Sequence, residues 1–193
     1  MIHNQSILPM ALLGRPFTFL DIGCSYPKES CCYPLIELEC EGHFIDINHF
    51  DGWDGLNFHQ IDATKTDWNF VKEAEFLQID VEGIGKRFEV LKSVPLDTLD
   101  TKIIAIEHDG YRTKKHNVDF DSTERNPQRE YLTKLGWNLL YKDVTDHLGN
   151  DYEDYWVRDD IWGDCKHLYS ENELNHNIYE KLNKIWEENT YQH

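Results

Sequence analysis

The sequence lacks any long hydrophobic run. No apolar stretch approaches the ~20 residues that a membrane-spanning helix needs. The leading segment has a short apolar stretch, Ile7 to Leu13, with no basic residue before it, unlike the charged start and longer apolar region of a signal peptide. We interpret it as a leading piece of the fold that packs on the core. This predicts a cytoplasmic protein without a membrane partner.

Paired cysteine motifs are also missing, and glycine and proline are few. The five cysteines are odd in number and lack the C-x-x-C spacing of zinc sites: Cys24, Cys31, Cys32, Cys40 and Cys165. Neighbouring Cys31 and Cys32 would point apart on a helix, so we expect buried free thiols and no zinc. With only 11 Gly and 6 Pro in 193 residues, we expect no long linker and a single domain over 1–193.

Positive charge is scarce. The chain has 36 acidic and 19 basic residues, and its net charge is -17. Such a surface repels phosphate backbones, which disfavours a nucleic-acid partner. The short basic clusters 86–87 and 112–115 are explained equally well as solvated surface.

Short β-branched and aromatic runs alternate with helix-like stretches, which is typical of an α/β domain with a mostly parallel sheet. We predict seven strands, at 17–22, 43–47, 57–61, 76–80, 102–107, 137–142 and 154–158. We predict helices at 29–40, 84–94 and 127–135, the last with Asn126 as N-cap. An amphipathic C-terminal helix is expected over 170–190, opened by a capping box at 170–173. The polar stretch 109–125 is predicted to be a loop, either a binding loop or plain disorder.

Acidic residues stand at the ends of the first three predicted strands. Asp21 and Gly23 close the first strand, but Ser25 and Lys28 occupy places where dinucleotide enzymes carry further glycines. This favours a ligand without a pyrophosphate, such as S-adenosylmethionine, over NAD. Asp46 suits the hydroxyls of a ribose, and Asp62 suits an adenine amino group. Each acid alone is more often a solvated loop residue.

A second group of charged residues follows the fourth and fifth predicted strands. It comprises Asp80, Glu82, Glu107, His108 and Asp109. Such a group can raise a carboxyl pKa, hold a histidine as a base or bind a cation. The alternative is that some of these side chains cap helices.

Several motifs together resemble the FkbM-type S-adenosylmethionine-dependent methyltransferases. They are Phe19-Leu-Asp-Ile-Gly23, Asp80-Val-Glu-Gly83 with the following helix, the strand Ile103 to Asp109, Tyr131 to Trp137, and Asp154 to Arg158. The resemblance implies a Rossmann-like class I methyltransferase sheet of seven strands, mostly parallel, with the last strand antiparallel. It also implies an O-methyltransferase of a small molecule or glycan.

The same resemblance implies the site residues. Asp21, Gly23, Ser25, Asp46, Asp62 and Ala63 would line the cofactor pocket, and Asp80 and Glu82 would face the methyl-transfer site. The turn Cys24-Ser25-Tyr26-Pro27 departs from the family's glycine-rich turn. It places the pose of the methionine moiety in question.

Two mechanisms follow for a hydroxyl acceptor. In one, His108 or Glu82 is the general base. In the other, Asp80 and Asp109 chelate Mg²⁺, which lowers the pKa of the hydroxyl. A noncatalytic methyltransferase-like scaffold and an NAD-linked oxidoreductase remain as alternatives. The sequence leaves the acceptor open, and leaves open whether the chain forms a homo-oligomer.

Overall fold

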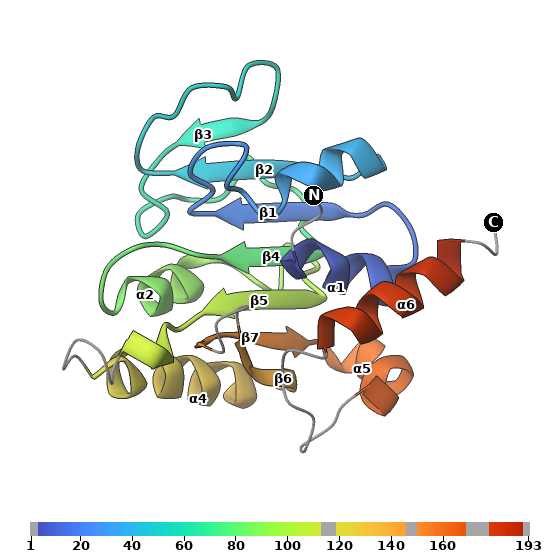
Figure 1. The fold of residues 1–193 in the computed structure, drawn as a ribbon. Coiled ribbons are helices and arrows are strands. Elements are labelled where there is room, and N and C mark those ends of the chain that lie inside the picture. Colours follow the sequence, from blue (N-terminus) through green and yellow to red (C-terminus); the bar gives the residue numbers. More distant parts are fainter. Residues whose placement is uncertain (1–3, 113–118, 146–149, 169–177, 191–193) are drawn as a thin grey trace.

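All seven predicted strands are present and form one sheet. The computed structural model describes residues 4–112, 119–145, 150–168 and 178–190. The strands are β1 (Thr18–Ile22), β2 (Glu41–Asp46), β3 (Phe58–Gln60), β4 (Phe76–Ile79), β5 (Ile103–Glu107), β6 (Asn138–Thr145) and β7 (Asp151–Val157). Their order is β3-β2-β1-β4-β5-β7-β6, and β7 runs antiparallel to both of its neighbours (Figure 1). This confirms the predicted Rossmann-like class I methyltransferase sheet.

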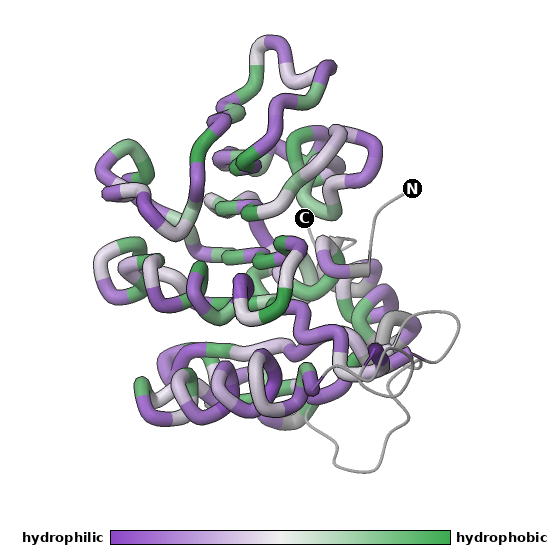
Figure 2. The backbone as a smooth tube through the Cα atoms, turned by 90° about the vertical axis from the view of Figure 1, so that its left-hand side faces the viewer, coloured by the Kyte–Doolittle hydropathy of each residue, from purple (hydrophilic) through white to green (hydrophobic). Residues whose placement is uncertain are grey.

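Helices cover both faces of the sheet because the central strands are apolar on both sides. In β1, Phe19 joins the core on one face and Leu20 joins the core on the other. The first face is covered by α1 (Asn4–Leu13), η1 (Tyr33–Leu38), α5 (Asp159–Cys165), η3 (Lys166–Leu168) and α6 (Ile178–Thr190). The second is covered by α2 (Lys86–Ser93) and α4 (Asn126–Lys134), which η2 (Asp121–Arg125) precedes. Figure 2 shows these two helical layers from the edge at which the parallel strands end.

The leading apolar segment packs on the core, as predicted. Ile7, Leu8 and Met10 are buried, and α1 lies against α6. Within the segment predicted as a C-terminal helix, 170–190, the structure has the helix α6 over Ile178–Thr190, and the predicted capping box at 170–173 lies outside the described residues. No helix in the described ranges is both long and apolar enough to cross a membrane.

Three local predictions were wrong. The helix predicted at 29–40 is only the 3-10 turn η1, because Pro34 lacks an N–H at its start and Glu39 closes it at φ 61°. Asn126 is not an N-cap, since the π-helical turn η2 runs directly into α4. The segment predicted as a loop is helical at residues 110–112 and 120–125, and 113–118 lie outside the described residues.

Candidate functional site

A cavity of about 430 Å³ opens at the carboxyl ends of β1, β2 and β4. Strand order reverses between β1 and β4, and in open α/β sheets such a reversal leaves a crevice where ligands bind. The volume suits a small-molecule ligand. The wall is formed by Ile22, Gly23, Cys24, Ser25, Glu29, Ile45, Asp46, Ile47, Asn48, Phe50, Ile61, Asp62, Ala63, Thr64, Asp80, Val81, Glu82, Lys86 and Val90.

Gly23 forms the floor of the cavity where β1 turns past the end of β4. Its φ is +90°, and its N–H donates to the carbonyl of Ile45 at 2.8 Å. A Cβ at this position would lie 1.8 Å from the backbone oxygen of Asp80. Only glycine therefore allows this close approach of the two chain segments.

The turn after Gly23 is held against the end of β2. The N–H of Ser25 donates to Oδ2 of Asp46 at 3.2 Å, and the N–H of Asn48 donates to Oδ1 of the same carboxylate at 2.8 Å. Each oxygen thus accepts one backbone hydrogen bond and keeps a further lone pair. Asp46 is therefore both oriented by the protein and able to accept hydroxyl groups of a ligand.

Asp62 and Ala63 form the opposite wall, beyond β3. Oδ1 of Asp62 accepts from the N–H and hydroxyl of Thr64, and Oδ2 pairs with Lys65 at 2.5 Å. The hydrogen bond from Lys65 and those from Thr64 hold the pKa of Asp62 at about 2, so this carboxylate is anionic. Ala63 is buried, and its carbonyl accepts the hydroxyl of Ser93 in α2.

Asp80 and Glu82 follow β4 and border the cavity from the other side. Desolvation raises the pKa of Asp80 above its usual range, although a hydrogen bond with Glu107 and the charge of Arg87 oppose the shift. Glu82 is largely exposed, with one oxygen 3.6 Å from the guanidinium of Arg112. A carboxyl pKa raised in this way is typical of functional sites.

The structure brings most of the predicted site residues to one cavity. Seven of them line it: Gly23, Ser25, Asp46, Asp62, Ala63, Asp80 and Glu82. Sequence reasoning missed Ile47, Asn48 and Phe50, which continue the chain beyond Asp46. Ile47 is a large apolar side chain that is 62% exposed, which is the signal that marks it as ligand-facing once the fold is known.

Asp21, by contrast, does not line the cavity. It is 2% exposed and lies beneath the turn, where it accepts the Ser30 hydroxyl at 2.6 Å. Burial raises its pKa to about 7. Side chains alternate along β1, so Asp21 faces the same side as Phe19, toward the layer of α1.

His108 was predicted to face the cleft, and the structure places it elsewhere. Its ring is fully buried; Nδ1 accepts the N–H of Gly110 at 3.0 Å. Nε2 lies 3.5 Å from Asp154 and 3.6 Å from Asp143. Asp154 lies in β7 and Asp143 lies in β6, so the ring faces these two strands and does not line the cavity.

The predicted Mg²⁺ pair is bridged by an arginine. Nη2 of Arg87 lies 2.9 Å from Asp109, 3.1 Å from Glu107 and 3.7 Å from Asp80. This buried guanidinium supplies the positive charge that the prediction assigned to a metal. In the part of the chain that the structure describes, the groups with metal-ligand geometry are Asp21–Cys31–Cys32 and His108–Asp143–Asp154, and neither contains Asp80 or Asp109.

Solved structures share this fold. The chain is similar to 1,6-didemethyltoxoflavin-N1-methyltransferase of Burkholderia thailandensis, solved with 1,6-didemethyltoxoflavin and S-adenosylhomocysteine bound; TM-score 0.56, identity 12%, coverage 81% of this chain and 76% of that chain. It is also similar to an rRNA methylase from Streptococcus thermophilus, with a TM-score of 0.52 and 11% identity over 80% of this chain and 93% of that chain. A third similar structure is the methyltransferase domain of bacterial CtHen1, with a TM-score of 0.53 and 8% identity over 82% of this chain and 99% of that chain.

No protein-family model matches the sequence, and no curated protein matches it. At 8 to 12% identity, the structural likeness establishes the class I methyltransferase fold. The acceptor differs among these neighbours, whose names refer to a small molecule and to rRNA.

Proposed function

We propose that this chain is an S-adenosylmethionine-dependent methyltransferase that methylates a hydroxyl group of a small molecule or a sugar. The observation that carries the proposal is the cavity at the strand-order reversal. There Gly23 lets the end of β1 pass close to the backbone of Asp80, and Asp46 presents a backbone-oriented carboxylate. The choice of an oxygen acceptor rests on the motif resemblance to FkbM-type enzymes.

The charge of the cavity favours a sulfonium ligand over a dinucleotide. Acidic side chains outnumber basic ones five to one in its wall: Glu29, Asp46, Asp62, Asp80 and Glu82 against Lys86. S-adenosylmethionine carries a positive sulfonium, which such a wall attracts. The pyrophosphate of NAD is repelled by the same wall, and the glycines that would admit it are absent. This argues against the oxidoreductase alternative.

The residues around Asp80 suit the proton transfer that a hydroxyl acceptor requires. S-adenosylmethionine supplies a methyl carbon to the acceptor oxygen; the S–CH₃ bond breaks and its electron pair stays on sulfur. Asp80 takes the hydroxyl proton: its carboxyl borders the cavity, and desolvation raises its pKa above the usual range. The walls around Gly23 and Asp46 hold the reactants in line, and this positioning is a large part of methyl-transfer catalysis.

A thermal-shift comparison tests the cofactor assignment. At ~100 times its dissociation constant, S-adenosylhomocysteine should stabilise the fold by about 2.7 kcal/mol, and NAD at the same concentration should not. Asp46→Ala should remove the shift, whereas the matched control Asp51→Ala, a fully exposed acid outside the cavity, should keep it. A shift with NAD alone would contradict the proposal.

A second assay tests the acceptor. Release of S-adenosylhomocysteine is measured with pairs of sugars and phenols that differ only in a free or a methyl-blocked hydroxyl. Turnover that requires the free hydroxyl supports O-methylation. Turnover with matched amines but not with hydroxyls would place the methyl group on nitrogen and overturn that part of the proposal.

A further inference from the structure

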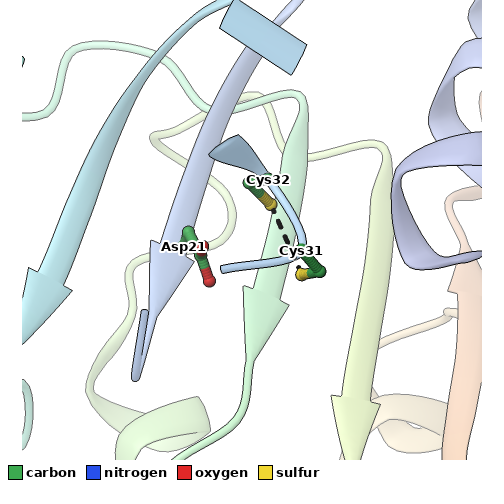
Figure 3. Close-up of side chains that lie close together, drawn as sticks. All are labelled: Asp21, Cys31 and Cys32. Atoms are coloured by element: carbon green, nitrogen blue, oxygen red, sulfur yellow. Dashed lines mark hydrogen bonds between the residues drawn. The ribbon is translucent and has the colours of Figure 1, made fainter. Parts of the chain in front are cut away.

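Cys31 and Cys32 lie together under the turn that forms one wall of the cavity. The chain is not helical at these residues, so the two thiols do not point apart as the sequence analysis predicted. Their Sγ atoms are 3.8 Å apart, and Cys32 is fully buried. Figure 3 shows both side chains beside Asp21 at the end of β1.

Asp21 completes a group of three ligand-type side chains. One carboxylate oxygen of Asp21 and the two sulfurs all lie within 4.8 Å of one another. The Ser30 hydroxyl donates to Oδ2 of Asp21 and so orients the carboxylate, as outer-shell partners of metal ligands do.

The sulfur separation is that of a tetrahedral metal site. Zinc binds thiolate sulfur at about 2.3 Å, and two such sulfurs at a tetrahedral angle stand about 3.8 Å apart. The thiols therefore need no rearrangement relative to each other to share one ion. A mixed sulfur and carboxylate set suits Zn²⁺ among the common biological cations.

A further buried carboxyl lies near the trio. Glu153 of β7 is fully buried, and its charge acts on both Cys31 and Cys32. Its Oε1 accepts from Gln78 at 3.1 Å, and burial raises its pKa to about 8 although hydrogen bonds with Gln78 and Tyr155 oppose the shift. A cation held by the two thiolates would favour the anionic form of this carboxyl.

A disulfide between the two cysteines is the competing chemistry, and backbone geometry disfavours it. Adjacent Cα atoms are about 3.8 Å apart, whereas disulfides usually need 4.4 Å or more. It also gives no role to Asp21.

We infer that Cys31, Cys32 and Asp21 bind one Zn²⁺ ion. The two cysteines bind as thiolates and release their protons on binding. The ion would be structural, because it ties the end of β1 to the segment that carries Ser25 and Glu29 in the cavity wall. In this chain it would brace the turn that lacks the family's usual glycines.

Metal analysis of the full chain tests the site. Protein purified from zinc-supplemented cells should contain about one Zn²⁺ per chain after dialysis. The double variant C31S/C32S should lower that content roughly tenfold or more, whereas Cys40→Ser, a buried thiol outside the trio, should leave it unchanged. Cobalt loaded in place of zinc should give tetrahedral visible bands and a thiolate charge-transfer band that the double variant lacks.

A second variant covers the case in which the double variant does not fold. Asp21→Asn preserves the shape of the side chain and should weaken cobalt affinity roughly tenfold or more, with its circular dichroism unchanged. Zinc retained by the double variant, or a Cys31–Cys32 disulfide in the mass of the native protein, would overturn the inference. So would native protein that takes up neither zinc nor cobalt. Binding of S-adenosylhomocysteine is measured separately, so failure of the metal site is distinguishable from failure of the proposed activity.

Discussion

Two groups of carboxylates stand at the carboxyl edge of the sheet, and they differ in their counter-ions. At β1, β2 and β4, Asp46 and Asp80 border a cavity, and the partners of Asp46 among the described residues are backbone N–H groups. At β5 and β7, Asp109 and Asp154 are buried against arginines. Arg129 binds Asp154 through two hydrogen bonds of 2.7 Å.

The difference teaches which strand-end acids are available to a ligand. Burial alone would raise the pKa of Asp154, but Arg129 and His108 hold it well below its usual range. Both oxygens of that carboxylate accept hydrogen bonds from within the protein, so it is not available to a ligand. An acid whose hydrogen bonds come only from backbone N–H groups, as in Asp46, keeps lone pairs that face the cavity.

Removal of a buried arginine is the strongest test of this difference between the two groups of carboxylates. Arg87→Met removes the buried cation from Glu107 and leaves Asp109 with only the partly exposed Arg112, and breaking a buried pair costs about 3–5 kcal/mol. Urea unfolding should show this loss. The control Arg158→Met removes a partly exposed cation and should cost at most about 1 kcal/mol. Equal losses in both variants would show that the buried group is not held by its arginine.

On the cavity side, Asp80→Asn should lower the turnover rate and leave the affinity for S-adenosylhomocysteine nearly unchanged. Removal of a general base lowers the rate by roughly 10²–10⁴-fold. Steady-state release of S-adenosylhomocysteine, with the best acceptor found, measures the rate, and calorimetry should show cofactor-product affinity within a few-fold of wild type. Glu82→Gln is the matched control, because Glu82 is largely exposed. A larger loss in Glu82→Gln would move the base role to that residue.

Asp46→Asn should weaken S-adenosylhomocysteine binding by roughly tenfold to a hundredfold. Hydrogen bonds to a charged group contribute about 1.5–3 kcal/mol, and the amide accepts through one oxygen only. Calorimetric titration measures the affinity. Asp51→Asn should bind like wild type, and an unchanged affinity in Asp46→Asn would exclude this carboxylate from the ribose.

The smallest effect concerns Glu75, a paired carboxylate far from the cavity wall. Burial alone would raise its pKa, but Arg15 at 2.6 Å and Lys102 at 2.7 Å hold it at about 2. Its folded-state pKa lies below the unfolded value of about 4.3, so its stabilisation is present at neutral pH and is lost as pH falls from about 5 toward 2.

Glu75→Gln should therefore cost about 2 kcal/mol at pH 7 and progressively less at lower pH. Unfolding free energies of wild type and variant at pH 7, 4 and 3 measure this convergence. A difference that stays constant with pH would show that packing, rather than charge, holds Glu75.

Strands and the glycine turn were predictable because their signals are local. The run Phe19-Leu-Asp-Ile predicts a buried strand, and the following Gly23 predicts a turn. A side chain at Gly23 would block that turn. Strand ends of a parallel sheet share one edge, so Asp46 and Asp62 could be placed near the cavity from their order alone.

The partners of strand-end side chains were not predictable in the same way. His108 and Asp109 stand next to each other, yet one packs against β6 and β7 while the other binds Arg87. That outcome depends on β7 entering the sheet between β5 and β6, and on an arginine in α2. Both partners come from chain segments more than 20 residues away.

By itself, the sequence determined the alternation of strands and helices, the surplus of acids at the strand ends and the turn at Gly23, which a side chain would block. These follow from side-chain periodicity and backbone sterics, which act over a few residues. The tertiary structure alone decided which acids meet a cation, which face the cavity and which lie beside Cys31 and Cys32. Those outcomes depend on electrostatics and burial between distant segments, and no local pattern records them.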